Sequence, residues 1–431
     1  MRRVFVIFIV MTLLAACLSR AAGVAEAKTP PVPAIASDDV SVILMLRSSS
    51  PTPILPAGKP ASHAGRVKAV VDRLRAQADA AQPPVLARLE QMRASGKVRQ
   101  IQPFWIVNAV AVTAQAASLA ELAALPGVAS ITPNNPIRLA GDQTQIQTSD
   151  PPLSLEQIHA PEVWASGFTG QGVVVANLDT GVSLNAPSLA GKYRGGPNSW
   201  YDVQGEHATP YDANGHGTGT MEIMVSDSFG VAPGAKWMAV KIFSDQGNAS
   251  DADAIAGLQW VLAPNGDPSA APDVVNNSWS DAAVDPTQPC PDNPVMHAAL
   301  QALVEADILP IFAAGNFGPG IPSAPAPSSY PEVLAVGAID SASTVALFSS
   351  RGPSNCRPAG MVFPDISAPG TSIDFYTPNR ILVQGSGTSF AAPHVAGALA
   401  VLLSASPHLT AAQQRMALQS AAVDLGSPGP D

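Results

Sequence analysis

Charged residues are scarce in this 431-residue chain: they make up 13% of it, against 46% for hydrophobic residues. The 23 lysines and arginines are outnumbered by 33 aspartates and glutamates, so the chain lacks the basic surface that nucleic-acid binding requires. There is no internal repeat, and after residue 17 we expect no membrane span. With 34 glycines and 42 prolines, the composition indicates a loop-rich globular protein of one to three domains.

The first 27 residues predict a signal peptide, and therefore export. Met1-Arg2-Arg3 supplies a positive start, and residues 4–16 form an apolar run too short for a membrane anchor. Two alternative cleavage positions for this signal peptide fit the sequence. Leu14-Ala15-Ala16-Cys17 resembles a bacterial lipobox, which would leave a lipoprotein at the cell surface, anchored through Cys17. Ala25-Glu26-Ala27 resembles an ordinary cleavage site, which would release a secreted protein, and both remain open.

Charge divides the rest of the chain into two parts of opposite sign. Residues 28–145 contain twelve basic and seven acidic residues, a net charge of +5. Residues 146–431 contain eight basic and twenty-five acidic residues, a net charge of −17. The opposite charges predict that the two parts attract each other.

The basic part has the pattern of a small α+β module. Apolar runs at 40–46 and 105–112 predict strands, and the segment 64–92 predicts a helix that Pro83-Pro84 interrupts. A short helix and a further strand follow. The next stretch, 133–152, is polar and rich in proline and asparagine without periodicity, which predicts an exposed, cleavable linker.

The acidic part predicts an α/β fold. Short apolar runs bounded by turn residues are typical of strands buried on both faces, and segments with helical patterns, 250–262 and 295–306, alternate with them. The alternation predicts a mostly parallel sheet with helices on both faces, preceded by the small α+β domain. The expected strands are 173–178, 237–243, 274–277, 308–313 and 333–339.

Two polar residues stand where a parallel sheet gathers reactive groups, at the carboxyl ends of its strands. Asp179 closes the strand expected over 173–178. His216 follows the glycine-rich Asn214-Gly215, where a helix is expected to begin, and a helix N-terminus favours the neutral imidazole that a general base needs. Taken singly, each is also typical of an ordinary turn or surface residue.

Ser389 lies in Gly387-Thr388-Ser389-Phe390-Ala391-Ala392-Pro393-His394, at the first turn of a predicted apolar helix. A serine hydroxyl becomes a nucleophile when a base takes its proton, and a helix N-terminus directs free N–H groups at developing negative charge. Asn316 follows the strand expected over 308–313, where its amide could donate to the same charge. An N-cap serine and a turn asparagine are the ordinary interpretations of each alone.

These segments together resemble the motif set of the subtilisin-like (subtilase) serine peptidases, with flanks similar to the bacillopeptidase F-like branch. The order of aspartate, histidine and serine is the known subtilisin order. The resemblance covers residues 155–425. Its motifs are Asp179-Thr180-Gly181, His216-Gly217-Thr218, Ala314-Gly315-Asn316 and the segment around Ser389.

The resemblance implies a serine endopeptidase that forms an acyl-enzyme. Ser389 would attack the peptide carbonyl and His216 would transfer the proton. Asp179 would orient the imidazole, and Asn316 with the Ser389 N–H would bind the oxyanion. The pocket for the residue before the cleaved bond is expected to be formed by Ser278, Trp279, Ser280, Ala313, Ala314 and Gly315.

The resemblance also divides the chain into domains. After the signal peptide at 1–27, residues 28–140 resemble a propeptide that assists folding and inhibits, 141–154 form a linker with the maturation site, and 155–431 form the catalytic domain. Protein or peptide substrates and the chain's own propeptide are the expected partners. Because relatives usually continue past this point, we expect the catalytic domain to be truncated at its C-terminus.

No cofactor or metal ligand is assigned. Subtilases often bind structural calcium, which the acidic part would allow, but no loop in the sequence fixes a site. Cys290 and Cys356 would pair in an oxidising compartment if the fold brings them together. The histidines outside the motifs show no zinc-ligand spacing: His63, His159, His207, His297 and His408.

Three residues depart from the family pattern. Gly219 stands where many relatives have a second histidine, and Ser280 replaces a glycine beside the pocket. Glu222 replaces a glycine and is expected to crowd the helix or perturb the base. Glu222 and the short C-terminus support the alternative function, a catalytically impaired peptide-binding pseudopeptidase. An aspartic peptidase would need a second Asp-Thr-Gly, and an α/β-hydrolase would need its aspartate and histidine after the serine.

Overall fold

The computed structural model describes residues 38–47, 62–140, 143–146, 153–281, 293–320, 322–358 and 360–425. The predicted signal peptide with Cys17, and also Cys290, lie outside these ranges. Asp39–Asp431 form one unit, and the description below is of that unit.

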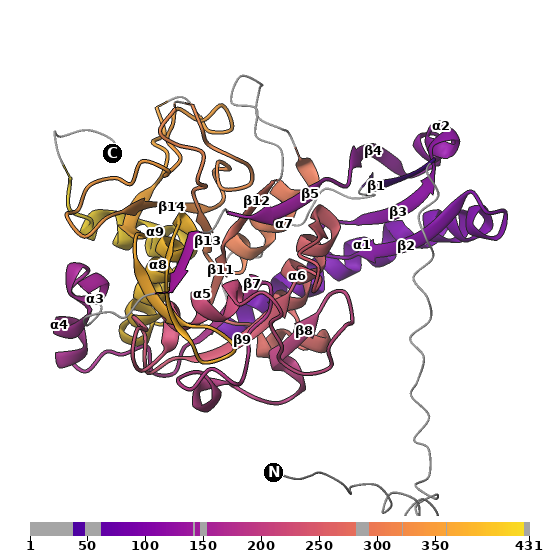
Figure 1. Cartoon of the computed structure of the whole chain (residues 1–431). Coiled ribbons are helices and arrows are strands. Elements are labelled where there is room, and N and C mark those ends of the chain that lie inside the picture. The colour runs from indigo at the N-terminus through magenta and orange to yellow at the C-terminus, as the bar shows by residue number, and fades with distance from the viewer. Residues whose placement is uncertain are drawn as a thin grey trace, which may run out of the picture. The chain divides into compact units, whose positions relative to one another are not determined.

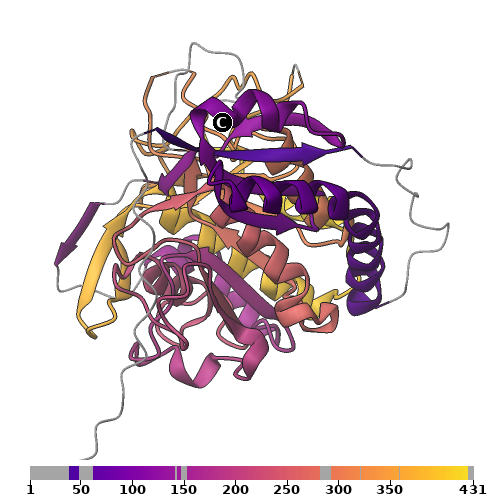
Figure 2. The ribbon, with the colours of Figure 1, turned by 90° about the vertical axis from the view of Figure 1, so that its right-hand side faces the viewer.

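The N-terminal part of this unit is a four-stranded antiparallel sheet with a long helix packed on it (Figure 2). The strand order is β2-β3-β1-β4. Val42 and Leu44 pack with Val85 and Leu89 of the helix in one apolar core. The strands are β1 (Asp39–Leu46), β2 (Val98–Phe104), β3 (Ala109–Gln115) and β4 (Val128–Pro133), and the helices are α1 (His63–Ala94) and α2 (Leu119–Ala123).

Helix α1 runs without a break through Pro83 and Pro84, so the predicted interruption is wrong. The backbone hydrogen bonds lost at the prolines are offset by packing on both sides of them. Before them, Gln82 donates from Nε2 to the Phe104 carbonyl at 2.8 Å. After them, Val85 is buried against the sheet. Tertiary contacts therefore outweigh the local signal.

The prediction of an exposed linker over 133–152 is wrong for its first residues. Pro136–Leu139 form strand β5, and Ile137 and Ala140 are only 4% and 2% exposed. Strand β5 lies between β10 (Ala249–Ser250) and β12 (Trp279–Asp281) and is antiparallel to both. The partners of β5 come from distant parts of the chain. For this reason the sequence of β5 alone does not predict a strand.

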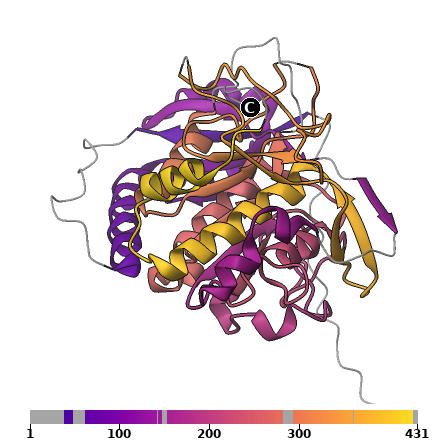
Figure 3. The ribbon, with the colours of Figure 1, turned by 90° about the vertical axis from the view of Figure 1, so that its left-hand side faces the viewer.

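The backbone beyond Ala140 is also paired. Gln143–Ile146 form strand β6, which pairs antiparallel with β17 (Leu382–Ser386). Strand β17 forms a hairpin with β16 (Ile373–Tyr376), and Figure 3 shows β6 beside this hairpin. The stretch around Ala140 is thus held by pairing both before and after it.

The predicted parallel sheet is present, with seven strands among the described residues in the order β15-β14-β13-β11-β7-β9-β8 (Figure 1). In β7, Val175 packs in a cluster with α5 (His216–Val225) and α8 (Thr388–Ala405), whereas Ala176 packs with α6 (Asp251–Leu262) and α7 (Pro294–Glu305). Helices therefore cover both faces, which confirms the predicted α/β fold. The strands are β7 (Val174–Asp179), β8 (Trp200–Asp202), β9 (Lys236–Lys241), β11 (Val274–Asn277), β13 (Pro310–Ala313), β14 (Leu334–Ile339) and β15 (Ile366–Pro369).

The main helices of this part are α5 and α8 on one face and α6 and α7 on the other. One described helix, α8, is long and apolar enough to cross a membrane, but 78% of it is buried within the molecule, as in a core helix. The helices are α3 (Leu153–Gln157), α4 (Ala160–Ala165), α5 (His216–Val225), α6 (Asp251–Leu262), α7 (Pro294–Glu305), α8 (Thr388–Ala405) and α9 (Ala411–Ala421).

Candidate active site

Asp179 is the last residue of β7 and faces helix α5. Side chains alternate along a strand, so Asp179 lies on the same face as Val175 and Asn177, which packs on α5. Asn177 donates from Nδ2 to the Gly217 carbonyl at 3.2 Å. Asp179 Oδ1 lies 2.7 Å from His216 Nδ1, and the two residues are 0% and 2% exposed. The structure therefore brings the predicted acid and base into buried contact.

Helix α5 begins at His216, and its second residue has to be a glycine. A Cβ on Gly217 would lie 2.1 Å from the Gly181 carbonyl oxygen and 3.0 Å from Asp179 Cβ. Without it, the helix approaches the turn that follows β7, and the Gly217 N–H donates to Thr180 Oγ1 at 2.9 Å. This close approach sets the separation of the aspartate and the histidine.

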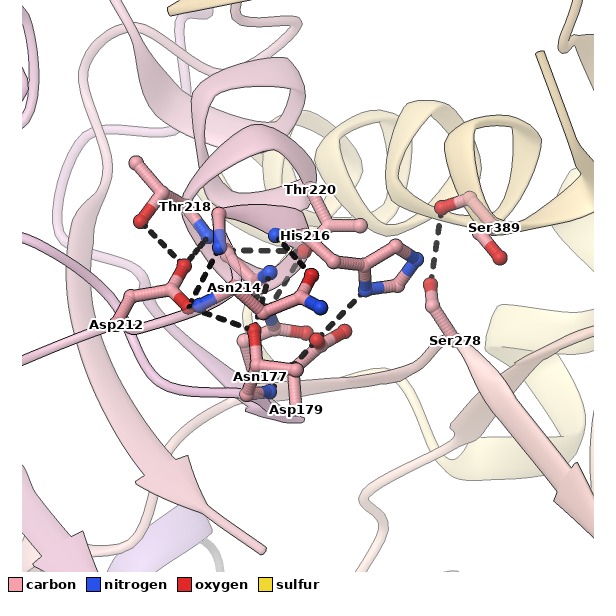
Figure 4. A network of polar contacts seen from close by, with 12 residues as sticks. Asn177, Asp179, Asp212, Asn214, His216, Thr218, Thr220, Ser278 and Ser389 are labelled. Atoms are coloured by element: carbon pink, nitrogen blue, oxygen red, sulfur yellow. Dashed lines mark hydrogen bonds and ion pairs between the residues drawn. The ribbon is translucent and has the colours of Figure 1, made fainter. Parts of the chain in front are cut away.

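A buried carboxylate, Asp212, organises the loop before His216 (Figure 4). Burial raises the pKa of Asp212, while its hydrogen bonds act in the opposite direction. The sequence offers no signal for this role other than a place four residues before His216. Oδ1 accepts hydrogen bonds from Thr180 Oγ1 (2.9 Å), Asn214 N (3.1 Å) and Gly215 N (2.8 Å), and Oδ2 accepts from Thr218 N (2.9 Å) and Thr218 Oγ1 (2.6 Å).

Ser389 is the second residue of α8 and lies on the far side of the imidazole from Asp179 (Figure 4). The rings of His216 and of Phe390, the residue after the serine, have centroids 5.8 Å apart. Ser389 Oγ donates to the carbonyl oxygen of Ala140 at 2.9 Å. The structure thus brings the three predicted catalytic residues to one place, with a segment of the same chain against the serine.

Asn316 follows β13 and directs its amide at the same carbonyl. Its Oδ1 accepts hydrogen bonds from Thr388 N and Thr388 Oγ1, both at 2.9 Å, which leaves Nδ2 to point the other way. Asn316 Nδ2 donates to the Ala140 oxygen at 2.5 Å. This oxygen therefore accepts from both Asn316 and Ser389. The only sequence signal for Thr388 is its place in the serine motif.

Three of the predicted pocket residues line the segment that ends at Ala140. The Ala140 N–H donates to the Ser278 carbonyl at 3.3 Å. Trp279 and Ser280 belong to β12, which pairs with β5. Ser278 Oγ also donates to the Ser389 carbonyl at 3.0 Å, so this stretch supports the helix that carries the serine.

The other three predicted pocket residues lie at and after the end of β13. Ala313 packs in the same apolar cluster as Ala140. Ala314 packs in a separate cluster with Phe363. The N–H of Gly315 donates to the hydroxyl of the first residue of α8 at 3.0 Å. Of these three, Ala313 is the residue that shares a cluster with Ala140.

The two unusual residues of α5 each have a structural partner. Glu222 is fully buried, Ser188 Oγ donates to both of its carboxylate oxygens at 2.7 Å, and burial raises its pKa to about 7. A Cβ on Gly219 would lie 2.6 Å from the ring of Phe375. The ring therefore fills the space that a larger residue at position 219 would need.

One group among the described residues has the composition of a metal site: ligand atoms of Glu206, His207 and Asp245 lie within 4.8 Å of one another. The ammonium of Lys241 already occupies this place, 2.6 Å from Glu206 Oε2 and 3.1 Å from Asp245 Oδ1. Because a cation of the chain itself neutralises the carboxylates, we assign no metal to this group.

A serine hydroxyl, an imidazole paired with a carboxylate, and a side-chain amide thus lie together at one carbonyl, which is the set of groups that acyl transfer by a serine nucleophile needs. Residues 170–431 match the Subtilase family. The chain belongs to the subtilase family of serine peptidases. The predicted family and the predicted enzyme class, serine-type endopeptidase, are confirmed by this match.

Named relatives agree with the family match. This subtilase is 38% identical to Bacillopeptidase F of Bacillus subtilis (strain 168) over 394 residues, which is 83% of this chain but 27% of the relative. It is 33% identical to Subtilisin E of the same organism over 339 residues, 77% of this chain and 79% of the relative. It is 34% identical to Subtilisin Savinase of Lederbergia lenta over 281 residues, 64% of this chain and 93% of the relative. The chain thus spans about a quarter of the length of Bacillopeptidase F.

Proposed function

We propose that this subtilase is made as a self-inhibited zymogen that cuts its own chain between Ala140 and Gly141 and then hydrolyses other proteins or peptides. One observation carries the proposal: the Ala140 carbonyl oxygen accepts hydrogen bonds from both Ser389 Oγ and Asn316 Nδ2. Acyl transfer needs a nucleophile beside the carbonyl carbon and a donor at its oxygen. Asn316 supplies the donor, and Ser389 Oγ lies 2.9 Å from the same carbonyl oxygen, which is one bond away from the carbon that Oγ would attack.

The backbone on each side of this carbonyl supports the same interpretation. Strand β5 is paired on both of its edges, with β10 and β12, and β6 is paired with β17. An extended peptide added to the edge of a sheet is a common way to hold a peptide in a binding site. After a cut at Ala140, β5 would still fill the cleft, and residues 28–140 would therefore inhibit the enzyme until they are released.

In the proposed chemistry, the Ser389 hydroxyl first turns its proton from the Ala140 oxygen to His216. Ser389 Oγ attacks the carbonyl carbon of Ala140 while His216 Nε2 takes the hydroxyl proton. Asp179, in contact with Nδ1, holds the ring and stabilises the imidazolium, and Asn316 donates to the oxygen as it becomes negative. His216 then gives the proton to the leaving amine, and the C–N bond breaks. A water molecule, activated in the same way, hydrolyses the ester on Ser389.

The proposal makes 28–140 the propeptide and 155–431 the catalytic domain, with the cut where the expected propeptide meets the 141–154 linker. Cys356 is disulfide-bonded, which supports export after removal of a 1–27 signal peptide, since disulfides persist in oxidising compartments. Its predicted partner, Cys290, lies outside the described residues. Recovery of the protein from the medium or from membranes, with Cys17 and with Cys17→Ala, distinguishes free secretion from a lipid anchor.

The full chain tests the proposal beside two variants. Ser389→Ala removes the nucleophile, and Ser404→Ala is a matched control on the same helix, because the Ser404 hydroxyl only donates to a helix carbonyl, that of Val401. We expect the wild type and the control to yield a catalytic chain that starts at Gly141 and reacts with a fluorophosphonate. Ser389→Ala should stay uncut and unlabelled.

Two results would contradict the proposal. A wild-type chain that stays uncut and unlabelled would favour the peptide-binding pseudopeptidase. A labelled chain whose first residue lies elsewhere would show that the Ala140 carbonyl is not the one attacked.

A further inference from the structure

We propose that Phe317 forms a subsite for a cationic side chain, so that this peptidase prefers substrates with arginine or lysine two residues before the residue whose carbonyl is attacked. The inference rests on the proposed function, in which β5 lies in the cleft as a substrate does. Arg138 occupies the subsite here, with its guanidinium carbon 4.8 Å from the centroid of the Phe317 ring.

The position of Phe317 follows from the oxyanion site. Phe317 comes directly after Asn316, and residues two apart on an extended strand point to the same side of it. Asn316 contacts Ala140, and Phe317 contacts Arg138, two residues earlier on the same segment. The Phe317 N–H donates to Ser350 Oγ at 3.1 Å, which holds the backbone that carries the ring.

The ring gives this subsite its selectivity for charge. A guanidinium within about 6 Å of an aromatic face is attracted by the electrons of the ring. Ile137 is buried and Leu139 is partly buried, whereas Arg138 is exposed, so shape alone excludes little at its position. In the described parts of the chain Arg138 forms no ion pair. The ring is therefore what favours a cation over a neutral side chain of the same size.

The net charge of −17 on residues 146–431 also attracts cations, but it does not select a position in the peptide. A test must separate the two effects. Internally quenched peptides with the sequence Pro-Ile-Arg-Leu-Ala-Gly-Asp-Gln, which is that of residues 136–143, serve this purpose. In a second peptide citrulline replaces the arginine, which keeps the shape and removes the charge. In a third, citrulline stands at the same place and arginine replaces the first proline.

We expect the active wild type to cleave the first peptide with a kcat/KM about two- to fivefold higher than the other two. The ratio should fall to about one in Phe317→Leu, which keeps an apolar side chain, and persist in Phe317→Tyr, which keeps the ring. Equal values for the first and second peptides, or a preference that survives in Phe317→Leu, would overturn the subsite. Equal values for the first and third would assign the preference to overall charge.

A second measurement tests the subsite in a chain that cleaves no peptide bond. In the uncut Ser389→Ala chain, Arg138→Met and Phe317→Leu are made singly and together, and hydrogen exchange of the β5 amides is followed. We expect a non-additive change in protection of about two- to fivefold, whereas additive effects would contradict the contact. This chain cleaves nothing, so failure here counts against the subsite alone. Failure of the wild type to cleave any peptide counts against the proposed function.

Discussion

The hydroxyl of Thr180 donates a hydrogen bond of 2.9 Å to Asp212 Oδ1, and so joins the turn after Asp179 to the loop before His216. The same oxygen accepts from the N–H of Gly215, the residue that precedes the histidine, at 2.8 Å. One buried carboxylate thus fixes the backbone on both sides of the contact between acid and base. We infer that Asp212 is a positioning residue for the catalytic pair.

Replacement of Asp212 by asparagine should lower kcat much more than it changes KM. The amide offers one acceptor oxygen in place of two and sets its NH₂ group against N–H donors, so the loop shifts and His216 with it. A shift of about 1 Å can cost roughly 100-fold in rate, and we expect a fall in kcat of about 10- to 100-fold. Steady-state kinetics on a peptide substrate measures both constants.

A matched control is Asp202→Asn. Asp202 is also a buried carboxylate that accepts backbone N–H groups, from Gln204 at 3.0 Å and His207 at 2.8 Å, but it does not contact the site. Both variants should lose stability, by about 1–3 kcal/mol. Equal losses of kcat in the two variants would show that Asp212 only stabilises the fold.

The stability of the wild type should depend on the ionisation of Glu222. Burial raises its pKa from an ordinary 4.5 to about 7, so the folded chain keeps a proton that the unfolded chain releases. Folding therefore becomes less favourable as the pH rises from about 4.5 to about 7. Glu222→Gln cannot ionise, and it should match the wild type at pH 4 and exceed it by up to about 3 kcal/mol at pH 8. Urea denaturation in the Ser389→Ala background measures this, and a difference that does not change with pH would contradict it.

Gly219 should resist replacement because of Phe375. A Cβ at position 219 would lie 2.6 Å from the ring, so Gly219→Ala should cost about 1–3 kcal/mol of stability. In a Phe375→Leu background the same change should cost less, because the smaller side chain leaves room for the added carbon. The two single variants and the double variant form a cycle whose coupling energy checks the contact. Additive losses would mean that Phe375 is not the reason for the glycine.

On the proposed function, Arg66 should control how long residues 28–140 stay bound after the cut. Its Nε lies 2.8 Å from Asp307 Oδ2 of the catalytic part, and both side chains are buried. Removal of one partner leaves an uncompensated buried charge, so Arg66→Met should release the propeptide roughly 100-fold faster or more. The delay between self-cleavage and the appearance of peptidase activity measures the release.

Lys68→Met is the control for Arg66→Met. Lys68 lies on the same helix, but its side chain is 65% exposed and pairs with Asp72 of that helix. An exposed ion pair of this kind contributes little, so the delay should be nearly unchanged. A similar shortening in both variants would indicate a general charge effect and not the pair of Arg66 with Asp307.

The sequence predicts those parts of the structure that are determined by residues close together in the chain. The buried strands of the parallel sheet appear in the sequence as apolar runs; Asp179 ends one of these strands, and Asn316 lies in the turn after another. A helix that begins at His216 could be expected from the glycines before it. The contacts among these residues follow from the topology of the sheet, which the alternation of strands and helices predicts.

The missed parts depend on partners that are distant in the sequence. Residues Pro136–Leu139 become a strand only because β10 and β12 offer free edges. Pro83 and Pro84 are tolerated because the helix is packed on both sides of them. The role of Asp212 depends on a hydroxyl 32 residues earlier in the chain. No local sequence pattern predicts any of these three features.

Helix α1 rests on two different supports. Its second half packs on the sheet of its own module, whereas in the first half Val67, Val70, Val71 and Leu74 belong to a second apolar cluster, which joins residues of the module's own strands to residues of α6 and α7. If the module dissociates after the proposed cut, these four side chains lose the part of their burial that α6 and α7 supply; full exposure would cost about 1.5–3 kcal/mol for each. That half of the helix would then fray, and digestion of the freed module should begin within 63–74. On the proposed function, activation would thus be irreversible, because the released fragment would lose the conformation that binds the catalytic part and would be digested.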